Sequence, residues 1–226
     1  MIRLELRDVS RTYHLDEQRI PALSEVSLVA EAGTVTVLVG RSGCGKSTLL
    51  NLAGAMDFPD SGDVLIDGQS TTGLNERQLT ELRRNRIGFV FQSFQLLPTM
   101  TALENVELPL LLARKPNTEK IARERLRWVG LEGRERSLPH QLSGGQMQRV
   151  AVARALVQQP DILIADEPTG NLDTASGGDV LQLLQRAARE LGATLLMATH
   201  SAEAAAIADV RVYMRDGSVE SIQRNL

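Results

Sequence analysis

The feature that most constrains this chain is an apolar run that leads directly into a glycine-rich turn. Residues 35–39 read VTVLV, residues 40–48 read GRSGCGKST, and residues 47–55 are compatible with a helix. A buried strand, a glycine-rich turn and a helix start in this order predict a loop that cradles phosphates. The pattern G-x-x-x-x-G-K-S/T is met by Gly40, Gly45, Lys46 and Ser47.

Each part of this loop has a physical reason. Glycines let successive backbone N–H groups converge on an anion, and the helix N-terminus adds partial positive charge. Lys46 is expected to reach the β- and γ-phosphates of ATP, and Ser47 to ligate Mg²⁺. The whole loop is therefore predicted to bind the cofactor: Gly40, Arg41, Ser42, Gly43, Cys44, Gly45, Lys46, Ser47 and Thr48.

Cys44 allows two interpretations. It is either a small residue that points away from the phosphates, or an oxidation-sensitive switch whose thiolate is favoured by the helix N-terminus. It is the single cysteine of the chain, so no internal disulfide is possible, and this count fits a reducing compartment.

The arrangement of the other apolar runs predicts the fold class. Residues 162–165 (ILIA) and 194–198 (TLLMA) are almost uniformly apolar and precede helix-compatible stretches, which is typical of a parallel sheet in an α/β core. Residues 2–7, 25–30 and 63–67 alternate and predict antiparallel strands. We expect one domain over 1–226, in which 1–92 and 160–226 form the core and the β subdomain, and about 93–159 form an inserted helical subdomain.

Two acids follow the run at 162–165. Asp166 is placed to hold Mg²⁺ through water, and Glu167 to polarise an attacking water molecule. Adjacent acids at a strand end are often a solvated turn, but the phosphate loop in the same chain favours the functional interpretation. His200 follows the run at 194–198, where ligands collect in open α/β sheets. Its position alone leaves a structural and a catalytic role open.

A second phosphate-binding device is predicted at residues 142–146, which read LSGGQ. Ser143 can cap a helix, while Gly144 and Gly145 expose backbone donors to an anion. One chain has little use for two such devices around one nucleotide.

The ordered motifs resemble those of the ATP-binding cassette (ABC) ATPase family over essentially the whole chain. The resemblance implies a P-loop NTPase core of the ABC type, with an antiparallel β subdomain and an inserted α-helical subdomain, that binds ATP and Mg²⁺. The motifs that carry it are the phosphate loop, Gln92, LSGGQ at 142–146, ILIADE at 162–167, NLD at 171–173 and His200.

The resemblance also implies roles for single residues. Two copies would pair head to tail, with Ser143 to Gln146 of one covering the γ-phosphate held by the other. Gln92 would contact Mg²⁺ and the attacking water, and Asp173 would lie at the dimer interface. His200 would bind the γ-phosphate and orient the water. Tyr13 matches the aromatic residue that stacks on adenine, or else is a core aromatic at a strand end.

A branch of the family is suggested by three further segments. Residues 91–98, 101–106 and 167–173 are similar to the ATPases of macrolide exporters, lipoprotein-releasing complexes and the cell-division ABC complex. This implies an ATPase that powers a separate integral membrane permease, with a groove at 94–100 for contact. The alternative is a regulatory ATPase of cell division. Arg41 and Cys44 depart from the small or neutral residues common in this branch.

Composition excludes several classes of protein. With 42% hydrophobic residues, the chain is not disordered, and a net charge of −3 does not favour nucleic acid as a partner. Arg83, Arg84 and Arg86 are interpreted as a solvated helix face.

No apolar run approaches the roughly 18 residues of a membrane span, and the charged, alternating first ten residues do not resemble a signal peptide. We expect a cytoplasmic protein, peripheral on the inner face of the membrane through the permease. A single phosphate loop and a single LSGGQ disfavour the cassettes of translation or DNA repair.

Overall fold

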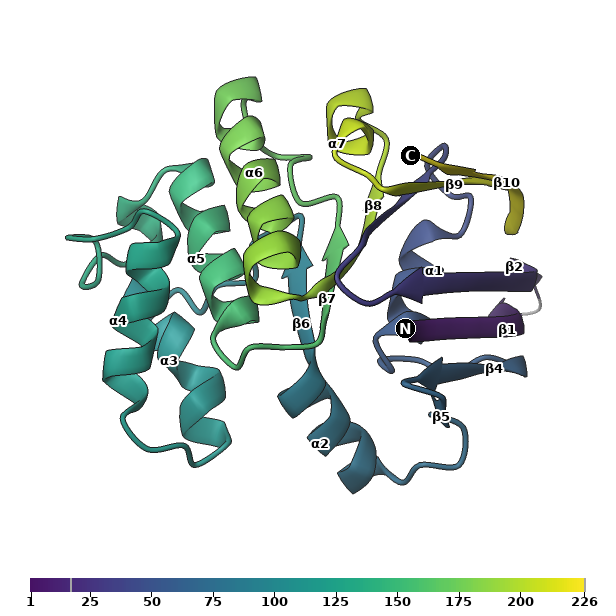
Figure 1. Ribbon diagram of the computed structural model, residues 1–226, viewed down its shortest axis with the longest axis horizontal. Coiled ribbons are helices and arrows are strands. Elements are labelled where there is room, and N and C mark those ends of the chain that lie inside the picture. The colour runs from purple at the N-terminus through teal and green to yellow at the C-terminus, as the bar shows by residue number, and fades with distance from the viewer. Residues whose placement is uncertain (17, 226) are drawn as a thin grey trace.

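The computed structural model describes residues 1–16 and 18–225. A six-stranded sheet and a four-stranded sheet enclose helix α1 (Lys46–Ala53), and further helices cover the other face of the larger sheet (Figure 1). In the described residues, no helix is long and apolar enough to cross a membrane.

The six-stranded sheet has the order β10-β9-β3-β8-β7-β6. The three strands predicted from apolar runs are confirmed as β3 (Val35–Val39), β7 (Ile162–Asp166) and β8 (Thr194–Thr199), and they pair in parallel. The sheet also contains β6 (Ile87–Phe91), β9 (Val210–Arg215) and an antiparallel edge strand, β10 (Ser218–Arg224).

The central strands are mostly apolar because each of their faces lines a different core. On β8, Leu195 and Met197 face the helices of one core, whereas Leu196 and Ala198 pack in the core around α1. Successive side chains of a strand point to opposite faces, so a strand that is covered on both sides has few polar positions, and those on β3 and β8 are threonines. The carboxyl ends of these strands therefore lead into the loops that carry the predicted acids and His200.

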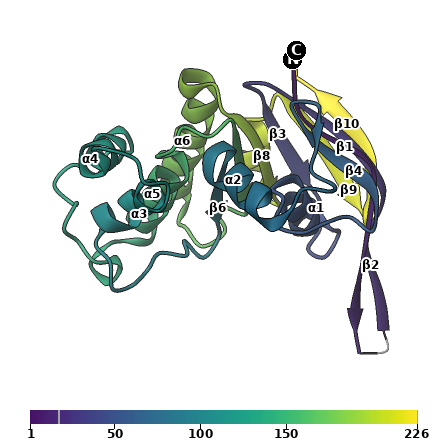
Figure 2. The same ribbon diagram turned by 90° about the horizontal axis from the view of Figure 1, so that it is seen from below.

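The antiparallel sheet has the order β2-β1-β4-β5 and confirms the strands predicted from alternation. Its members are β1 (Ile2–Leu15), β2 (Gln18–Glu31), β4 (Ser61–Ile66) and β5 (Gln69–Ser70). β1 and β2 are longer than predicted, and their hairpin extends beyond the body of the molecule (Figure 2). The amino-terminal half of β1 packs on α1, while the far half of the hairpin carries Tyr13 and Ile20 opposite each other.

Helices dominate the segment between β6 and β7. It contains α3 (Ala102–Leu112), α4 (Thr118–Trp128), the short 3-10 helix η1 (Pro139–Gln141) and α5 (Gly144–Leu156), which gather at one end of the molecule (Figure 1). They fall within the range 93–159 predicted as helical, and the division of the chain into subdomains stays a prediction. The remaining helices are α2 (Glu76–Arg86), α6 (Thr174–Leu191) and α7 (Ala202–Ala206).

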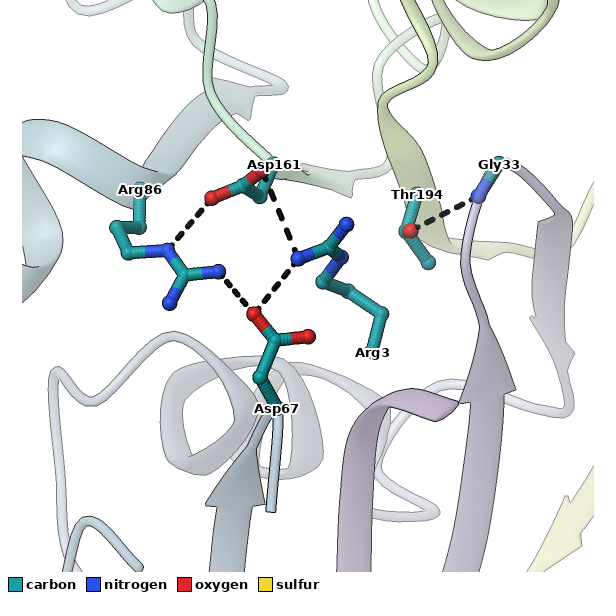
Figure 3. A network of polar contacts seen from close by, with 6 residues as sticks. All are labelled: Arg3, Gly33, Asp67, Arg86, Asp161 and Thr194. Atoms are coloured by element: carbon teal, nitrogen blue, oxygen red, sulfur yellow. Dashed lines mark hydrogen bonds and ion pairs between the residues drawn. The ribbon is translucent and has the colours of Figure 1, made fainter. Parts of the chain in front are cut away.

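The interpretation of Arg83, Arg84 and Arg86 as a solvated face of α2 holds only for Arg84. Arg83 is half-buried and donates to the backbone oxygen of Ala55 at 2.8 Å. Arg86 joins a ring of ion pairs in which it contacts Asp67 and lies 2.5 Å from Asp161 (Figure 3).

Arg3 completes this ring at 2.6 Å from Asp67 and 3.6 Å from Asp161. The four side chains come from β1, the turn after β4, the end of α2 and the residue before β7, so the ring ties the small sheet to the large one (Figure 3). Nearby, the amide of Gly33 donates to the hydroxyl of Thr194 at 3.1 Å, which adds a link between the turn after β2 and the start of β8.

Candidate functional site

A cavity of about 730 Å³ opens at the start of α1. Its size suits a nucleotide-sized ligand, since small-molecule sites span roughly 300–1,000 Å³. It brings together most of the predicted phosphate loop and the acids that follow β7. The lining residues are Ile20, Pro21, Ala22, Arg41, Ser42, Gly43, Gly45, Lys46, Ser47, Thr48, Gln92, Asp166, Glu167 and His200.

The loop between β3 and α1 has a shape that only glycine allows at two positions. Gly45 has a φ of 99°, and a Cβ there would lie 2.5 Å from the backbone oxygen of Ala22. A Cβ on Gly40 would lie 2.5 Å from the backbone oxygen of Met214. The described structure gives α1 no side-chain cap. The first-turn N–H groups, which lack intrahelical partners, are therefore available to an anion.

Lys46 is held inside this loop. Its side chain is only 7% exposed, and Nζ donates to the backbone oxygens of Gly40 at 2.7 Å and Arg41 at 3.0 Å. The ammonium is thus fixed by two carbonyl groups of the loop itself. Among the described residues no carboxylate forms an ion pair with it, so this ammonium and the helix N-terminus beside it create a local positive field that attracts phosphate.

Cys44 lies under the loop. Its side chain is 6% exposed and packs in the core cluster around α1, and a Cβ on Gly40 would touch its Sγ. This burial supports the interpretation of Cys44 as a small residue that points away from the phosphates.

Asp166 ends β7 with a carboxylate that is not fully satisfied. Its Oδ1 is buried and has no hydrogen-bond partner among the described residues. Burial raises the pKa of Asp166 and the charge of Glu167 raises it further, while the Ser47 hydroxyl and Lys46 oppose the shift. A buried unpaired carboxylate oxygen is costly, and a cation or a cation-bound water would satisfy it.

The donor set around Asp166 suits Mg²⁺ rather than a transition metal. Ser47, Gln92 and Asp166 all line the cavity. The described residues contain no group of three or more His, Cys, Asp and Glu side chains that could hold a metal ion. Mg²⁺ characteristically keeps several waters and binds through one or two protein ligands together with substrate phosphates, so the residues present fit it.

Glu167 and His200 form a pair at the edge of the cavity. Nδ1 of His200 lies 3.0 Å from Oε1 of Glu167, whose side chain is 18% exposed, and His200 itself is mostly exposed. Glu167 has a φ of 46°, in the left-handed region, and its amide donates to the backbone oxygen of Ala198 at 3.0 Å. A non-glycine residue in this region is uncommon, and here it turns the carboxylate into the cavity.

Gln92 is attached to the loop that precedes α6. Its Nε2 donates to Oδ1 of Asn171 at 3.2 Å, and Nδ2 of Asn171 donates to the backbone oxygen of Gln92 at 3.1 Å. Gly170 leaves room for this contact, because a Cβ there would lie 2.7 Å from Nε2 of Gln92. Asn171 was not predicted as a site residue, although it belongs to the NLD motif. Its side-chain amide has both donors and an acceptor oxygen, so it can form the two hydrogen bonds with Gln92.

The LSGGQ segment forms the start of α5, away from the cavity lining. Ser143 caps the helix as predicted: its hydroxyl accepts from the amide of Gln146 at 3.2 Å, and the Gln146 side chain accepts from the amide of Ser143 at 3.0 Å. Neither Gly144 nor Gly145 has a hydrogen-bond partner for its N–H group within residues 1–16 and 18–225. Asp173 caps α6 through the amide of Ser176, which lowers the pKa of Asp173.

Tyr13 is placed outside the lining of the cavity. Its hydroxyl donates to Asp57 at 2.9 Å, and the guanidinium of Arg11 lies 5.0 Å from the ring centroid. Ile20, which pairs with Tyr13 across the hairpin, lines the cavity instead, together with Pro21 and Ala22. No sequence signal marked these three residues, because their contribution depends on the length and bend of the hairpin.

Gln148 is a second residue that sequence reasoning missed. It is fully buried on α5, and its Nε2 donates to the backbone oxygens of Phe91 at 3.2 Å and Pro168 at 2.6 Å. It therefore links α5 to the residues just before Gln92 and just after Glu167. A glutamine in a helix has no sequence pattern that distinguishes a buried bridge from an exposed side chain.

Comparison with known proteins gives a consistent result over the whole chain. Residues 23–170 match the model of the ABC transporter family. An uncharacterized ABC transporter ATP-binding protein of Thermotoga maritima is 47% identical over 98% of this chain and 95% of its own length. The lipoprotein-releasing system ATP-binding protein LolD of Bordetella pertussis is 44% identical over 96% of this chain and 95% of its own.

Two further matches extend the comparison. The macrolide export ATP-binding/permease protein MacB of Syntrophobacter fumaroxidans is 45% identical over 96% of this chain, which spans 31% of that longer protein. The cassette MJ0796 of Methanocaldococcus jannaschii has been solved as a dimer in a post-hydrolysis state bound to ADP and Pi. It superposes with a TM-score of 0.91 at 42% identity and 98% coverage of both chains.

Proposed function

The chain belongs to the ABC transporter family as an ATP-binding subunit, and we propose that it hydrolyses ATP in the cavity at the start of α1. The observation that carries this proposal is the meeting of four groups at one cavity: the uncapped helix start, Lys46, Asp166 and the Glu167–His200 pair. Binding of a polyphosphate needs the first two, and its cleavage by water needs the others.

Ser47, Gln92 and Asp166, which all line the cavity, would hold Mg²⁺. When bound, it supplies neutralisation of the charge that develops on the phosphates. The buried Oδ1 of Asp166, which has no partner among the described residues, supports this assignment. Lys46 and the first-turn amides of α1 would bind and orient the β- and γ-phosphates.

Glu167 is proposed as the residue that polarises the attacking water. Its carboxylate accepts a proton from that water, and its left-handed backbone conformation fixes the direction of the side chain. Nδ1 of His200, 3.0 Å from Oε1 of Glu167, keeps the carboxylate in place and leaves the exposed edge of the imidazole for the γ-phosphate. Gln92 positions the water once its amide leaves Asn171.

A second copy of the chain would complete the site. Gly144 and Gly145 present N–H groups at the start of α5, but the cavity lining includes neither residue. A head-to-tail pair would bring Ser143 to Gln146 of one copy over the γ-phosphate held by the other, with Asp173 at the interface. The dimeric cassette MJ0796, at 42% identity, supports this arrangement.

The partner of this dimer is proposed to be an integral membrane permease with which the chain works in export, efflux or lipoprotein release. The names of MacB and LolD support this role. The chain would be cytoplasmic and peripheral, on the inner face of the membrane through the permease. Residues 94–100 are the proposed contact. Arg154 holds the start of this segment through the backbone oxygens of Phe94 at 3.0 Å and Gln95 at 2.6 Å.

Glu167→Gln tests the proposed catalysis. Because the variant keeps the shape but not the basicity of the side chain, we expect phosphate release to fall by a factor of roughly 10²–10⁴ while ATP binding persists. Size-exclusion chromatography in ATP should then show an accumulated dimer. Glu81→Gln, on the exposed face of α2, is the matched control and should keep full turnover. Unchanged turnover in Glu167→Gln would remove Glu167 from the proposed role.

A further inference from the structure

A second cavity, of about 420 Å³, lies among the helices at the end of the molecule far from the small sheet. It is formed where the carboxyl ends of α3 and α5 meet one face of α4. Leu110, Ile121 and Val157 provide apolar surface, and Trp128 provides an aromatic wall. Neither the phosphate loop nor any residue of the proposed ATPase mechanism lines it.

The polar group that distinguishes this cavity is the guanidinium of Arg125. Among residues 1–16 and 18–225 it has no hydrogen bond and no ion pair within 4 Å; the ring of Trp128 lies 5.7 Å away, and the charge of the neighbouring Glu124 acts on it. Its side chain is half-buried, and burial lowers the pKa of Arg125. A half-buried guanidinium without a hydrogen-bond acceptor keeps its donors for a ligand, since charges withdrawn from water are normally paired.

The other two arginines of α4 are paired, unlike Arg125. On the same helix, Arg123 pairs with Glu119 at 2.7 Å and Arg127 pairs with Glu132 at 3.3 Å. Arg186 also lies over Trp128, at 4.7 Å, but it is paired with Glu190. Each of these three faces solvent, whereas the unpaired one lines the cavity.

The backbone oxygens at the helix end beside the cavity already accept other hydrogen bonds. The backbone oxygen of Pro109 accepts from Nε2 of Gln158 at 3.1 Å, and that of Leu110 accepts from the amide of Lys115 at 3.0 Å. Lys115 is a second cation of the lining, is exposed, and also has no ion pair within the described part of the chain. Glu124 is the one acid of the lining, so the cavity has an excess of positive charge.

We propose that this cavity is a docking site for an acidic segment of a partner protein. A carboxylate of the partner would pair with Arg125, whose planar fork suits bidentate contact, and with Lys115. An adjacent apolar side chain would lie on Trp128 and Ile121. Leu111 and Leu112, which follow Leu110 on α3, are 53% and 62% exposed and add apolar surface next to the site. Charge and apolar surface together thus select a carboxylate flanked by leucine-like residues.

The chain carries its own reporter for the test, because Trp128 is its single tryptophan. The blocked peptide Ac-Leu-Glu-Leu-Leu-NH2 and its Gln analogue are titrated into the full chain while tryptophan emission is followed. We expect a saturable change with the Glu peptide and roughly tenfold weaker binding of the Gln peptide, because a charge-assisted hydrogen bond is lost. Rising salt should weaken only the Glu peptide.

Two variants make the test specific. Arg125→Met should lose most of the preference for the Glu peptide, with only the contribution of Lys115 left, while Arg127→Met, on the same helix but paired with Glu132, should keep the tenfold preference. Far-UV circular dichroism and an unchanged basal ATPase rate check that Arg125→Met is folded; where it is not, Arg125→Lys, which keeps charge but not the fork, should show a reduced preference. The proposal is overturned when the wild type shows no saturable change, or when a folded Arg125 variant keeps the full preference.

Discussion

Two helices of this protein begin in glycine-rich sequence, and the two starts are built in opposite ways. α1 follows Gly45, which has a left-handed conformation, and lacks a side-chain cap in the described structure. α5 follows Ser143, which forms a complete capping box with Gln146. The first start lines a cavity of about 730 Å³ with Lys46 and Asp166, whereas the second lies outside that lining.

This difference indicates what each start still lacks. At α1, the loop holds Lys46 with its own carbonyl groups and leaves amides free, and a buried oxygen of Asp166 has no partner among the described residues. At α5, the Ser143 and Gln146 side chains satisfy each other, and within the described residues the amides of Gly144 and Gly145 remain without partners. The α1 start thus forms the main part of the cavity, and we propose that the α5 start completes the site of a second copy.

The largest expected effect follows from removing the cation of the α1 start. Lys46→Ala deletes the ammonium that the carbonyls of Gly40 and Arg41 hold. Loss of one such preorganised donor reduces turnover by roughly 10²–10³, and a phosphate-release assay measures it. Lys120→Ala, an exposed lysine on α4, is the control and should be unchanged. Equal activity of the two variants would contradict the comparison.

A pair of glycine substitutions sharpens the contrast. Gly45→Ala places a side chain at a φ of 99° and 2.5 Å from the oxygen of Ala22, so we expect a loss of roughly 1–3 kcal/mol in the free energy of unfolding. Gly144→Ala meets ordinary contacts, the nearest at 3.4 Å, so its stability should change little. Urea denaturation of the two variants measures this, and similar losses would show that the two starts are not built differently.

The smallest expected effect is a gain in stability on replacing a site residue, Asp166. Burial raises the pKa of Asp166 above its ordinary value of 3.8, so its charge at neutral pH destabilises the folded protein. Asp166→Asn should therefore raise the thermal midpoint at neutral pH in the absence of nucleotide. This gain should shrink as the pH falls through the raised pKa and disappear below 3.8, where Asp166 is neutral in both states.

Addition of Mg²⁺ and ATP should raise the thermal midpoint of the wild type above that of Asp166→Asn, since only the wild type gains a cation at Asp166. Stability that is the same in both proteins at every pH would contradict the assignment of Asp166 as a strained carboxylate. The pKa of Asp173 moves the other way, because the amide of Ser176 donates to it at the capped start of α6.

Much of the fold could be predicted because its signals are local. The three apolar runs became β3, β7 and β8 almost residue for residue, since strands covered on both faces consist mainly of apolar side chains. The Ser143 cap was predicted for the same reason: a capping box is decided within four residues. Lys46, Ser47, Asp166 and Glu167 follow such strands directly, so topology alone brings them to one edge of the sheet.

The remaining parts depend on contacts between segments far apart in sequence. Asn171 clamps Gln92 across 79 residues, and Gln148 bridges two loops from a helix interior. Arg86 was interpreted as solvated because its partners, Asp67 and Asp161, lie on other elements. The distance of Tyr13 from the cavity lining likewise follows from the geometry of the β1–β2 hairpin and not from the residue type.

The central claim is that the two helix starts of one chain serve two different nucleotides. Lys46→Ala disables the first start, and Gly144→Asp disables the second by placing a negative charge where the γ-phosphate of the other copy would bind, while an acid in the first turn still favours the helix. Each variant alone should be inactive. Mixed in equal amounts, they should recover about a quarter of wild-type phosphate release, because half of the dimers would contain one intact site of two. Activity that stays at the sum of the two separate variants would contradict the account.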